Sequence, residues 1–377
     1  MTPQSPARRR LLLAAPALAA TGWAGAQPGR PPARTLVVGQ LFDTAPAQQD
    51  VAKDFLVGSR AAWQEINARG GLGGHAVQHL TLEVDSRQPA SLQASVRTLR
   101  DHPGCLALSG TAGDFAASRV AALLRQEGIA LAHAAPWLQA GDDEPDDQTF
   151  PIFASRREQV AHAFRSLSVM NVSELGVVYA SELEFTAFQE DVTRAARALG
   201  LRLQVFRAGG ELLALGQKMG NTTPALLLFL GGTPELAQFS QGLERQARQR
   251  YLIALGDINL QTLQQMGGGR STPVIATQPV PVTSASLPVV RAYREALSRF
   301  FDEPPTALSL AGYIAARYTF EVLRELRGEP SRAQALAAFQ QRGSLDIGGF
   351  RVAFDGRRRA GAYVTQSMLT PDGRVIG

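Results

Sequence analysis

The sequence predicts an α/β fold with two domains, and two observations predict it. Runs that are apolar or alternate with period two recur between segments of helical periodicity almost throughout the chain, which is typical of parallel sheets covered by helices on both faces. The chain also has 377 residues, 45% of them hydrophobic, more than one ordinary core holds. We therefore expect two doubly wound lobes.

The first part of the chain supplies the elements of one lobe. We expect strands at 36–41, 80–84, 105–109 and 129–133, and helices at 51–68, around 92–99 and at 116–126. In the first helix, Val51, Phe55, Ala62 and Ile66 fall on one face, as in a helix that packs on a sheet. Glycines directly after residue 69 then end this helix.

A second series of strands and helices follows. We expect strands at 175–179, 203–206, 225–230, 252–255 and 274–277, with helices at 185–198 and 234–249. Two more helical segments, 287–300 and 308–327, come after Gln278-Pro279-Val280-Pro281. If these helices return to the first sheet, several crossing segments join the lobes, which suits a hinge that bends without losing register.

The amino-terminal residues predict export. Arg8, Arg9 and Arg10 precede an apolar run at 11–20, and Ala24-Gly25-Ala26 follows it, as in a secretory signal peptide that ends at residue 26. The paired arginines fit both general secretion and twin-arginine export. No later apolar run is long enough for a membrane helix. The expected location of the mature chain is the periplasm.

Composition argues against several classes of partner and site. The signal peptide carries three arginines and no acid, so its removal lowers the formal net charge from +5 to +2, and the remaining charges are interspersed, which gives a nucleic-acid partner no support. Cys105 has no second cysteine to pair with. The five histidines lack metal-ligand spacing, and no catalytic motif stands out. We expect no metal, no cofactor, no catalytic residue and no enzymatic activity.

One string of residues carries a family resemblance. Ile66-Asn67-Ala68-Arg69-Gly70-Gly71-Leu72-Gly73-Gly74 closely resembles the type I periplasmic binding proteins of the branched-chain amino acid (Leu/Ile/Val) transport family. The likeness extends over essentially the whole mature chain, including Gly348-Gly349-Phe350. The resemblance implies a Venus-flytrap fold with three hinge crossovers. Its implied limits are 35–154 plus 280–349 for the N-terminal lobe, 155–279 plus 350–377 for the C-terminal lobe, and crossovers near 154–155, 278–281 and 349–352.

The resemblance also implies ligand-binding residues in the first lobe, at the carboxyl ends of strands, where loops and helix N-termini converge. Thr111, Ala112 and Gly113 match the carboxylate-binding loop of the family, and Ala135 and Trp137 match the next ligand loop. Two alternatives stay open: Thr111 is a helix N-cap, and Trp137 packs under the acidic loop at 142–147 instead of stacking on a planar or apolar ligand.

In the second lobe, the resemblance implies ligand contacts at Phe185, Thr233 and Asp257. Phe185 matches an aromatic residue that covers the ligand, with core packing as the alternative. Asp257 matches the acidic residue that pairs with the ligand's ammonium group, with an ordinary turn aspartate as the alternative. Thr233 departs from the pattern, because the amino-acid binders carry an aromatic ring there, so one side of the ammonium cage is missing.

The function that the resemblance implies is that of the periplasmic substrate-binding component of an ABC transporter. The chain would bind an amino acid, or a related small carboxylate or amide, between its lobes and deliver it as a monomer to a permease in the inner membrane. A sensory module that presents its ligand to a membrane receptor is one alternative, and a secreted enzyme is another. The sequence does not separate transport from sensing, because both use the same clamp.

Overall fold

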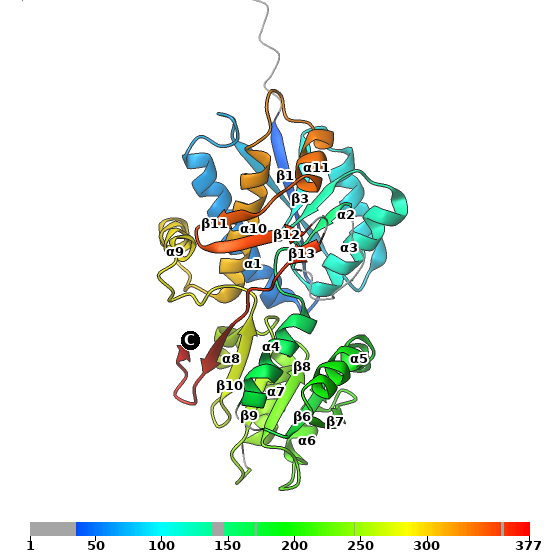
Figure 1. Ribbon diagram of the computed structural model, residues 1–377, viewed down its shortest axis with the longest axis vertical. Helices are drawn as coiled ribbons and strands as arrows, with labels where there is room; N and C mark the ends of the chain where they lie inside the picture. Colours follow the sequence, from blue (N-terminus) through cyan, green and yellow to red (C-terminus); the bar gives the residue numbers. More distant parts are fainter. Residues whose placement is uncertain (1–34, 138–146, 170–171, 245, 356–357) are drawn as a thin grey trace, which may run out of the picture. The chain divides into compact units, whose positions relative to one another are not determined.

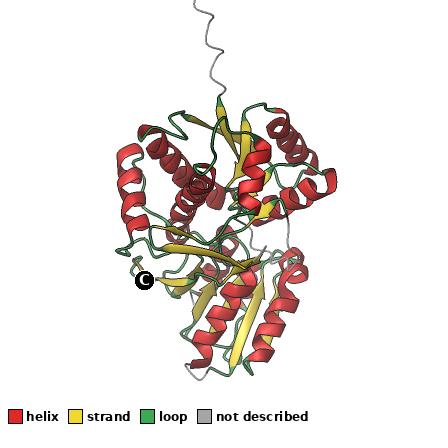
Figure 2. Ribbon diagram, turned by 45° about the horizontal axis from the view of Figure 1, so that its top comes forward, coloured by secondary structure: helices red, strands yellow, loops and turns green. Residues whose placement is uncertain are grey.

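The structure is a computed structural model that describes residues 35–137, 147–169, 172–244, 246–355 and 358–377. The predicted signal peptide, residues 1–26, lies outside the described residues. The described chain contains two sheets built mainly of parallel strands (Figure 1). Figure 2 shows helices covering the faces of these sheets. The predicted α/β fold is therefore confirmed.

The first sheet has the strand order β2-β1-β3-β4-β5, and its neighbouring strands are parallel. Its strands are β1 (Leu36–Asp43), β2 (Val77–Val84), β3 (Cys105–Ser109), β4 (Ala132–Ala134) and β5 (Thr149–Phe150). The helices around it are α1 (Gln49–Ala68), α2 (Pro89–Asp101), α3 (Asp114–Glu127), α9 (Pro288–Phe300), α10 (Ala307–Leu323) and α11 (Arg332–Gln340). In β1, Val37 and Leu41 pack in the cluster with α2 and α3, whereas Leu36 and Val38 pack in the cluster with α1 and α10. This alternation buries both faces of the sheet.

The second sheet has the order β15-β14-β10-β9-β8-β6-β7, in which the pairs β10–β14 and β14–β15 are antiparallel and the other pairs are parallel. Its strands are β6 (Glu174–Tyr179), β7 (Arg202–Arg207), β8 (Leu226–Leu230), β9 (Tyr251–Ala254), β10 (Val274–Gln278), β14 (Thr365–Leu369) and β15 (Val375–Ile376). Its helices are α4 (Arg156–Val169), α5 (Glu182–Ala198), α6 (Leu212–Gln217), α7 (Thr233–Leu243) and α8 (Leu260–Gln265). Leu227 and Phe229 of β8 face one cluster, and Leu228 and Leu230 face the other, so this lobe is doubly wound as well.

The late helices α9 and α10 return to the first sheet. The Ser59 hydroxyl of α1 donates to the Gly312 carbonyl of α10, and Val290 and Ile314 belong to the same apolar cluster as Val38. The chain therefore passes from the first sheet to the second between β5 and α4 and back between β10 and α9. These two crossings lie where the sequence analysis expected them.

The last crossing lies later in the chain than expected. A three-stranded antiparallel sheet contains β11 (Leu345–Ile347), β12 (Phe350–Asp355) and β13 (Arg358–Ala360). Phe350 and Val352, assigned above to the C-terminal lobe, are buried in the apolar cluster of the first sheet. The next strand, β14, pairs with β10 of the second sheet. The domain limits stay a proposal, and these contacts favour placing the last boundary between Ala360 and Thr365.

The helix predicted at 234–249 is shorter in the structure. It begins at Thr233 and ends at Leu243. Beyond it, the Gln246 side chain donates to the Gly216 carbonyl, and the Arg250 side chain donates to the Gly220 carbonyl. These two side chains bind the loops on either side of α6. The helix therefore ends before its periodic sequence pattern ends, because tertiary contacts fix the residues that follow it.

Candidate functional site

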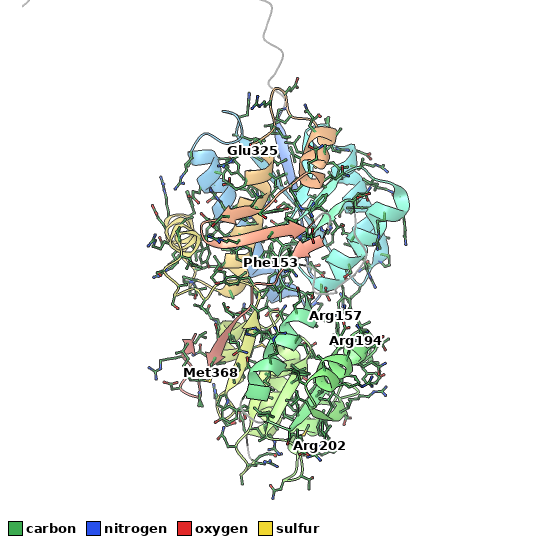
Figure 3. The ribbon with its side chains drawn as sticks, viewed as in Figure 1. Phe153, Arg157, Arg194, Arg202, Glu325 and Met368 are labelled. Atoms are coloured by element: carbon green, nitrogen blue, oxygen red, sulfur yellow. The ribbon has the colours of Figure 1, made fainter. Side chains whose placement is uncertain are left out.

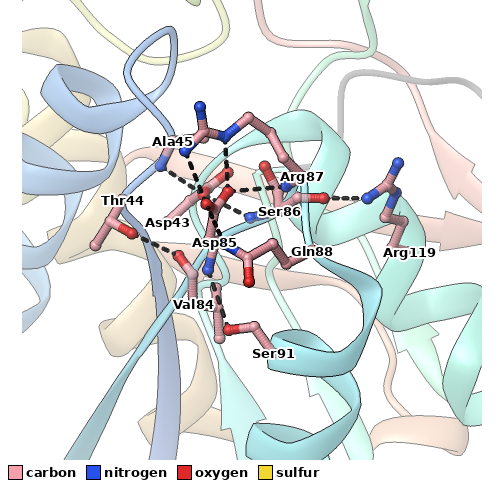
Figure 4. A network of polar contacts seen from close by, with 10 residues as sticks. All are labelled: Asp43, Thr44, Ala45, Val84, Asp85, Ser86, Arg87, Gln88, Ser91 and Arg119. Carbon is pink, nitrogen blue, oxygen red and sulfur yellow. Dashed lines mark hydrogen bonds and ion pairs between the residues drawn. The ribbon is translucent and has the colours of Figure 1, made fainter.

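The carboxyl ends of β1 and β2 are tied together by a network of polar contacts (Figure 4). Oδ1 of Asp43 accepts hydrogen bonds from the backbone amides of Ala45 (3.0 Å) and Ser86 (3.1 Å). The Arg119 side chain of α3 donates to the Ser86 carbonyl. Asp43 is fully buried, and its Oδ2 has no hydrogen-bond partner among the described residues. The network therefore positions the loop that leads into α1.

Thr111 lies between β3 and α3 and is fully buried. Its hydroxyl is hydrogen-bonded to Nε2 of His133 at 2.9 Å, and its carbonyl accepts from the Trp137 amide at 2.8 Å. Burial lowers the pKa of His133 to about 3, so the ring is neutral. Thr111 does not cap α3, because the residue before that helix is Gly113, with a φ of 99°. Ala112 is buried in the same loop.

Ala135 and Trp137 follow β4 and are also buried. Ala135 has a φ of 47°, a left-handed conformation that disfavours residues with a side chain. The Trp137 ring packs against Phe55 (5.8 Å between centroids) and Phe153 (5.3 Å), the latter labelled in Figure 3. The Trp137 ring therefore packs among aromatic side chains of the first lobe, and stacking on a ligand stays a proposal.

Asp257 follows β9 and is 4% exposed. Its Oδ1 accepts from Nε1 of Trp137 at 3.2 Å. Its Oδ2 accepts from Nη2 of Arg156, the first residue of α4. Thr111, Trp137 and Asp257 therefore form one continuous chain of contacts between strand ends of the two sheets. Among the described residues, the Asp257 carboxylate is thus paired with a guanidinium group as well as with an indole.

Arg156 is the residue that the sequence analysis missed. Its Nη1 lies 3.6 Å from Oδ2 of Asp114, in the first turn of α3. Its guanidinium carbon lies 3.7 Å from the ring centroid of Phe188. Burial alone would lower the pKa of Arg156, but the Asp257 and Asp114 carboxylates outweigh it and raise that pKa. The only sequence signal was an arginine directly after the first expected crossover, and an arginine there is ordinarily a surface residue.

The two other predicted residues of the second lobe have protein partners as well. The Phe185 ring meets Tyr179 edge-on at 5.2 Å, and the guanidinium of Arg207 lies 4.2 Å from its centroid. Thr233 is fully buried, and its Oγ1 accepts from the Asn259 amide at 3.1 Å. Both side chains therefore contact other parts of the second lobe. A role in ligand binding remains a proposal for each of the eight predicted residues.

The lobes meet again at the starts of α1 and α7. A Cβ added at Gly232 would lie 2.8 Å from the Ala47 carbonyl, which shows how closely the backbones approach. Burial raises the pKa values of Asp50 in α1 and Glu235 in α7. Oδ2 of Asp54 accepts from the Asn259 side chain at 2.9 Å. This contact surface is therefore lined by carboxyl groups that burial makes harder to ionise.

A cavity of about 470 Å³ lies beside α8. Its lining includes Gln261 and Gln264 of α8, Gln278 at the second crossing, Thr306 before α10, and the final residue, Gly377. None of the eight predicted residues lines it. No cluster of metal-ligating side chains is present among the described residues. No helix of the described chain is long and apolar enough to cross a membrane.

The chain is similar in sequence to one protein family and similar in fold to solved structures. Residues 35–370 match the protein family described as periplasmic binding protein. No curated protein matches the sequence. A crystal structure of an extracellular ligand-binding receptor from Verminephrobacter eiseniae superposes with a TM-score of 0.79, at 21% identity, over 91% of this chain and 100% of the other.

Two further solved structures share the fold and differ in the ligand that they are described with. The branched-chain amino acid transporter substrate-binding protein of Streptococcus pneumoniae, in complex with isoleucine, has a TM-score of 0.74 at 15% identity and covers 90% of this chain and 97% of its own. The fatty acid ABC transporter substrate-binding protein of Thermomonospora curvata has a TM-score of 0.74 at 16% identity and covers 90% of each chain. At these identities the likeness establishes the fold and leaves the ligand open.

Proposed function

The chain belongs to the periplasmic binding protein family, and on that premise we propose that it binds one small organic molecule between its lobes and delivers it to an ABC permease in the inner membrane. The proposed ligand class comprises amino acids and related small carboxylates and amides. The mature chain, from Gln27 onward, would act in the periplasm as a monomer. The proposal needs binding and release only, with no covalent step.

One observation carries this proposal. Loops at the carboxyl ends of parallel strands from both sheets come into contact through Thr111, Trp137 and Asp257. In open α/β sheets, this edge is where ligands bind, because loops and helix N-termini converge there. Two such edges that face each other can enclose a ligand from both sides.

The proposed mechanism is a shift between separated and closed lobes. A ligand moves this equilibrium only by its difference in affinity for the two states, so contacts from the second lobe determine how firmly the lobes close. Closed lobes present two surfaces in a fixed relation, which a permease can recognise. The three crossings between the sheets are the segments that would bend.

A thermal-shift screen of the purified mature chain tests the proposal. The panel contains amino acids, amides, and aliphatic and aromatic carboxylates. A true ligand raises the melting temperature, and the rise grows with the logarithm of its concentration above the dissociation constant, because the ligand binds the native state. Cells that lack the chain should then lose uptake of the radiolabelled hit. A hit that is chemically converted by the protein, or normal uptake without the chain, would contradict the proposal.

A further inference from the structure

Resting on the proposed function, we infer that the ligand is an organic acid without an α-ammonium group and that Arg156 is the residue that selects it. The resemblance alone pointed toward a ligand whose ammonium pairs with Asp257. The contacts of Asp257 and Arg156 point to the opposite polarity at this position. The inference concerns the chemical class of the ligand and the residue that recognises it.

Both oxygens of Asp257 already have donors within the protein. Oδ1 accepts from the Trp137 indole, and Oδ2 accepts from the Arg156 guanidinium. The side chain of Asp257 is only 5% exposed. An ammonium group bound there would either displace this charge-assisted hydrogen bond or share the carboxylate with a guanidinium of the same charge, and both are unfavourable. The position expected to bind an ammonium is therefore occupied by a cation of the chain itself.

Nη1 of Arg156 is available to a ligand. Its Nη2 is bound to Asp257, whereas its Nη1 is buried and makes no hydrogen bond with any described residue. Arg156 is 9% exposed, and the ring of Phe188 lies against one side of its guanidinium. Buried donors without an acceptor are costly. A ligand carboxylate at Nη1 would supply that acceptor, and guanidinium groups suit carboxylates in shape and charge.

Asp114 is the competitor for Nη1, at a distance of 3.6 Å. This distance permits an ion pair without a hydrogen bond, so the contact is weaker than the one to Asp257. Asp114 lies in the first turn of α3, where the helix dipole stabilises a negative charge independently of Arg156. We infer that a ligand carboxylate takes the place of Asp114 at Nη1, while Asp257 keeps the guanidinium in position.

Carboxyl groups of Asp50 and Glu235 also lie at the contact between the lobes, and they are the rival site for an ammonium. Burial raises the pKa of both groups, so the charged form of each is less favourable than that of an exposed carboxyl group. The Asp50 carboxyl also interacts with the Thr233 side chain. The choice between the rival site and Arg156 follows from a comparison of matched ligands.

The experiment compares three amino acids with their deaminated counterparts by calorimetry on the mature chain. The pairs are L-valine and isovalerate, L-leucine and isocaproate, and L-phenylalanine and hydrocinnamate, which differ only in the α-ammonium group. We expect at least one acid to bind more than about tenfold more tightly than its amino acid. The ammonium group of the amino acid would be buried without an acceptor of its own, which is costly.

Two variants assign the effect to Arg156. Arg156→Gln should weaken binding of the acid by about tenfold or more. The matched control is Arg157→Gln, which should leave binding unchanged, because Arg157, labelled in Figure 3, forms an ion pair with Asp191 of α5 at 3.0 Å. Arg156→Gln leaves the Asp257 charge buried without its partner, which can unfold the protein. The double variant Arg156→Gln/Asp257→Asn removes both charges and so avoids this destabilisation. Its melting temperature and near-ultraviolet circular dichroism confirm the native fold.

Three outcomes overturn the inference. If an amino acid binds as tightly as its deaminated counterpart, or more tightly, the ligand class is wrong and the proposed function stands. If the folded double variant binds the acid like the parent chain, Arg156 does not select it. If none of the six compounds binds, and the wider thermal-shift panel also yields no hit, the proposed function fails together with the inference.

Discussion

Burial determines the protonation state of His133, one of the fully buried polar residues of the first lobe. Its Nε2 is hydrogen-bonded to Thr111, whereas its Nδ1 has no partner among the described residues. The pKa of His133 falls from 6.5 to about 3 because the charged ring would lose its hydration. The loop that contains Thr111 therefore depends on a histidine that must stay neutral.

This histidine predicts a stability that falls in acid. The pKa of His133 is lower in the folded chain than in the unfolded chain, so its contribution is complete above pH 6.5 and is lost as the pH falls toward about 3. From pH 7 to pH 5 we expect a loss of about 2 kcal/mol in the free energy of unfolding from this residue.

Urea unfolding at the two pH values measures the effect. The variant His133→Gln should lack this part of the pH dependence, whereas His75→Gln, at an exposed position, should retain it. An equal loss in the parent chain and in His133→Gln would show that His133 is protonated in the native state.

At the same scale, the sequence identified Thr111, Trp137 and Asp257, and the structure brings these three residues into contact. It could not identify Arg156 as the partner of Asp257, because 101 residues separate them. Pairing of buried charges depends on which strand ends become neighbours in space, and local sequence patterns carry no information about that.

The close crossing of α1 and α10 depends on two glycines. A Cβ at Gly58 would lie 1.6 Å from the Ser309 carbonyl oxygen, and a Cβ at Gly312 would lie 1.8 Å from the Phe55 carbonyl oxygen. Both obstacles are backbone atoms, which cannot rotate away as a side chain can. Helix α10 is therefore joined to α1 through backbone contact, and this pair anchors the returning part of the chain to the first lobe.

Replacing either glycine by alanine should separate these two helices. We expect Gly58→Ala and Gly312→Ala each to lower the free energy of unfolding by roughly 2–3 kcal/mol, as for overpacked cores. Chemical denaturation monitored by circular dichroism measures the change. Gly343→Ala is the control, because a Cβ there meets nothing within 4 Å. Equal stabilities of all three variants would show that the helices can move apart at little cost.

Elements with strong periodicity were predicted well, and short ones were not. The pattern around Val51 and Phe55 predicted a helix to residue 68, and α1 ends at Ala68. By contrast, β5 has two residues, and β11 and β13 have three each. Segments this short show no period, and their hydrogen-bonding partners lie elsewhere in the chain.

Polar contacts also join the lobes away from Trp137 and Asp257. The Asn259 side chain donates to Asp54 of α1. The Gln261 side chain of α8 donates to the Pro305 carbonyl at 3.3 Å, close to the start of α10. These contacts stabilise the arrangement in which the lobes touch, and they involve none of the groups that we propose for the ligand.

Removing them should favour separated lobes. For Asp54→Ala/Gln261→Ala without ligand, we expect a larger radius of gyration in small-angle X-ray scattering. We also expect ligand affinity to fall by about fivefold or more, since closure loses two hydrogen bonds with a net free energy of about 0.5–1.5 kcal/mol each. Arg202→Ala, which removes an exposed ion pair with Glu174, is the control. An unchanged radius and affinity would show that these contacts do not influence closure.

The sequence by itself determined the doubly wound architecture and the family, and it predicted the strand ends where we propose that a ligand binds. It could do so because periodicity, glycine-rich helix ends and local strings are properties of neighbouring residues. Only the tertiary structure decided that Trp137 is packed inside the protein, that Asp257 pairs with Arg156, and that β12 joins the first lobe. Each of these depends on contacts between distant segments, whose geometry arises when the sheets and helices assemble.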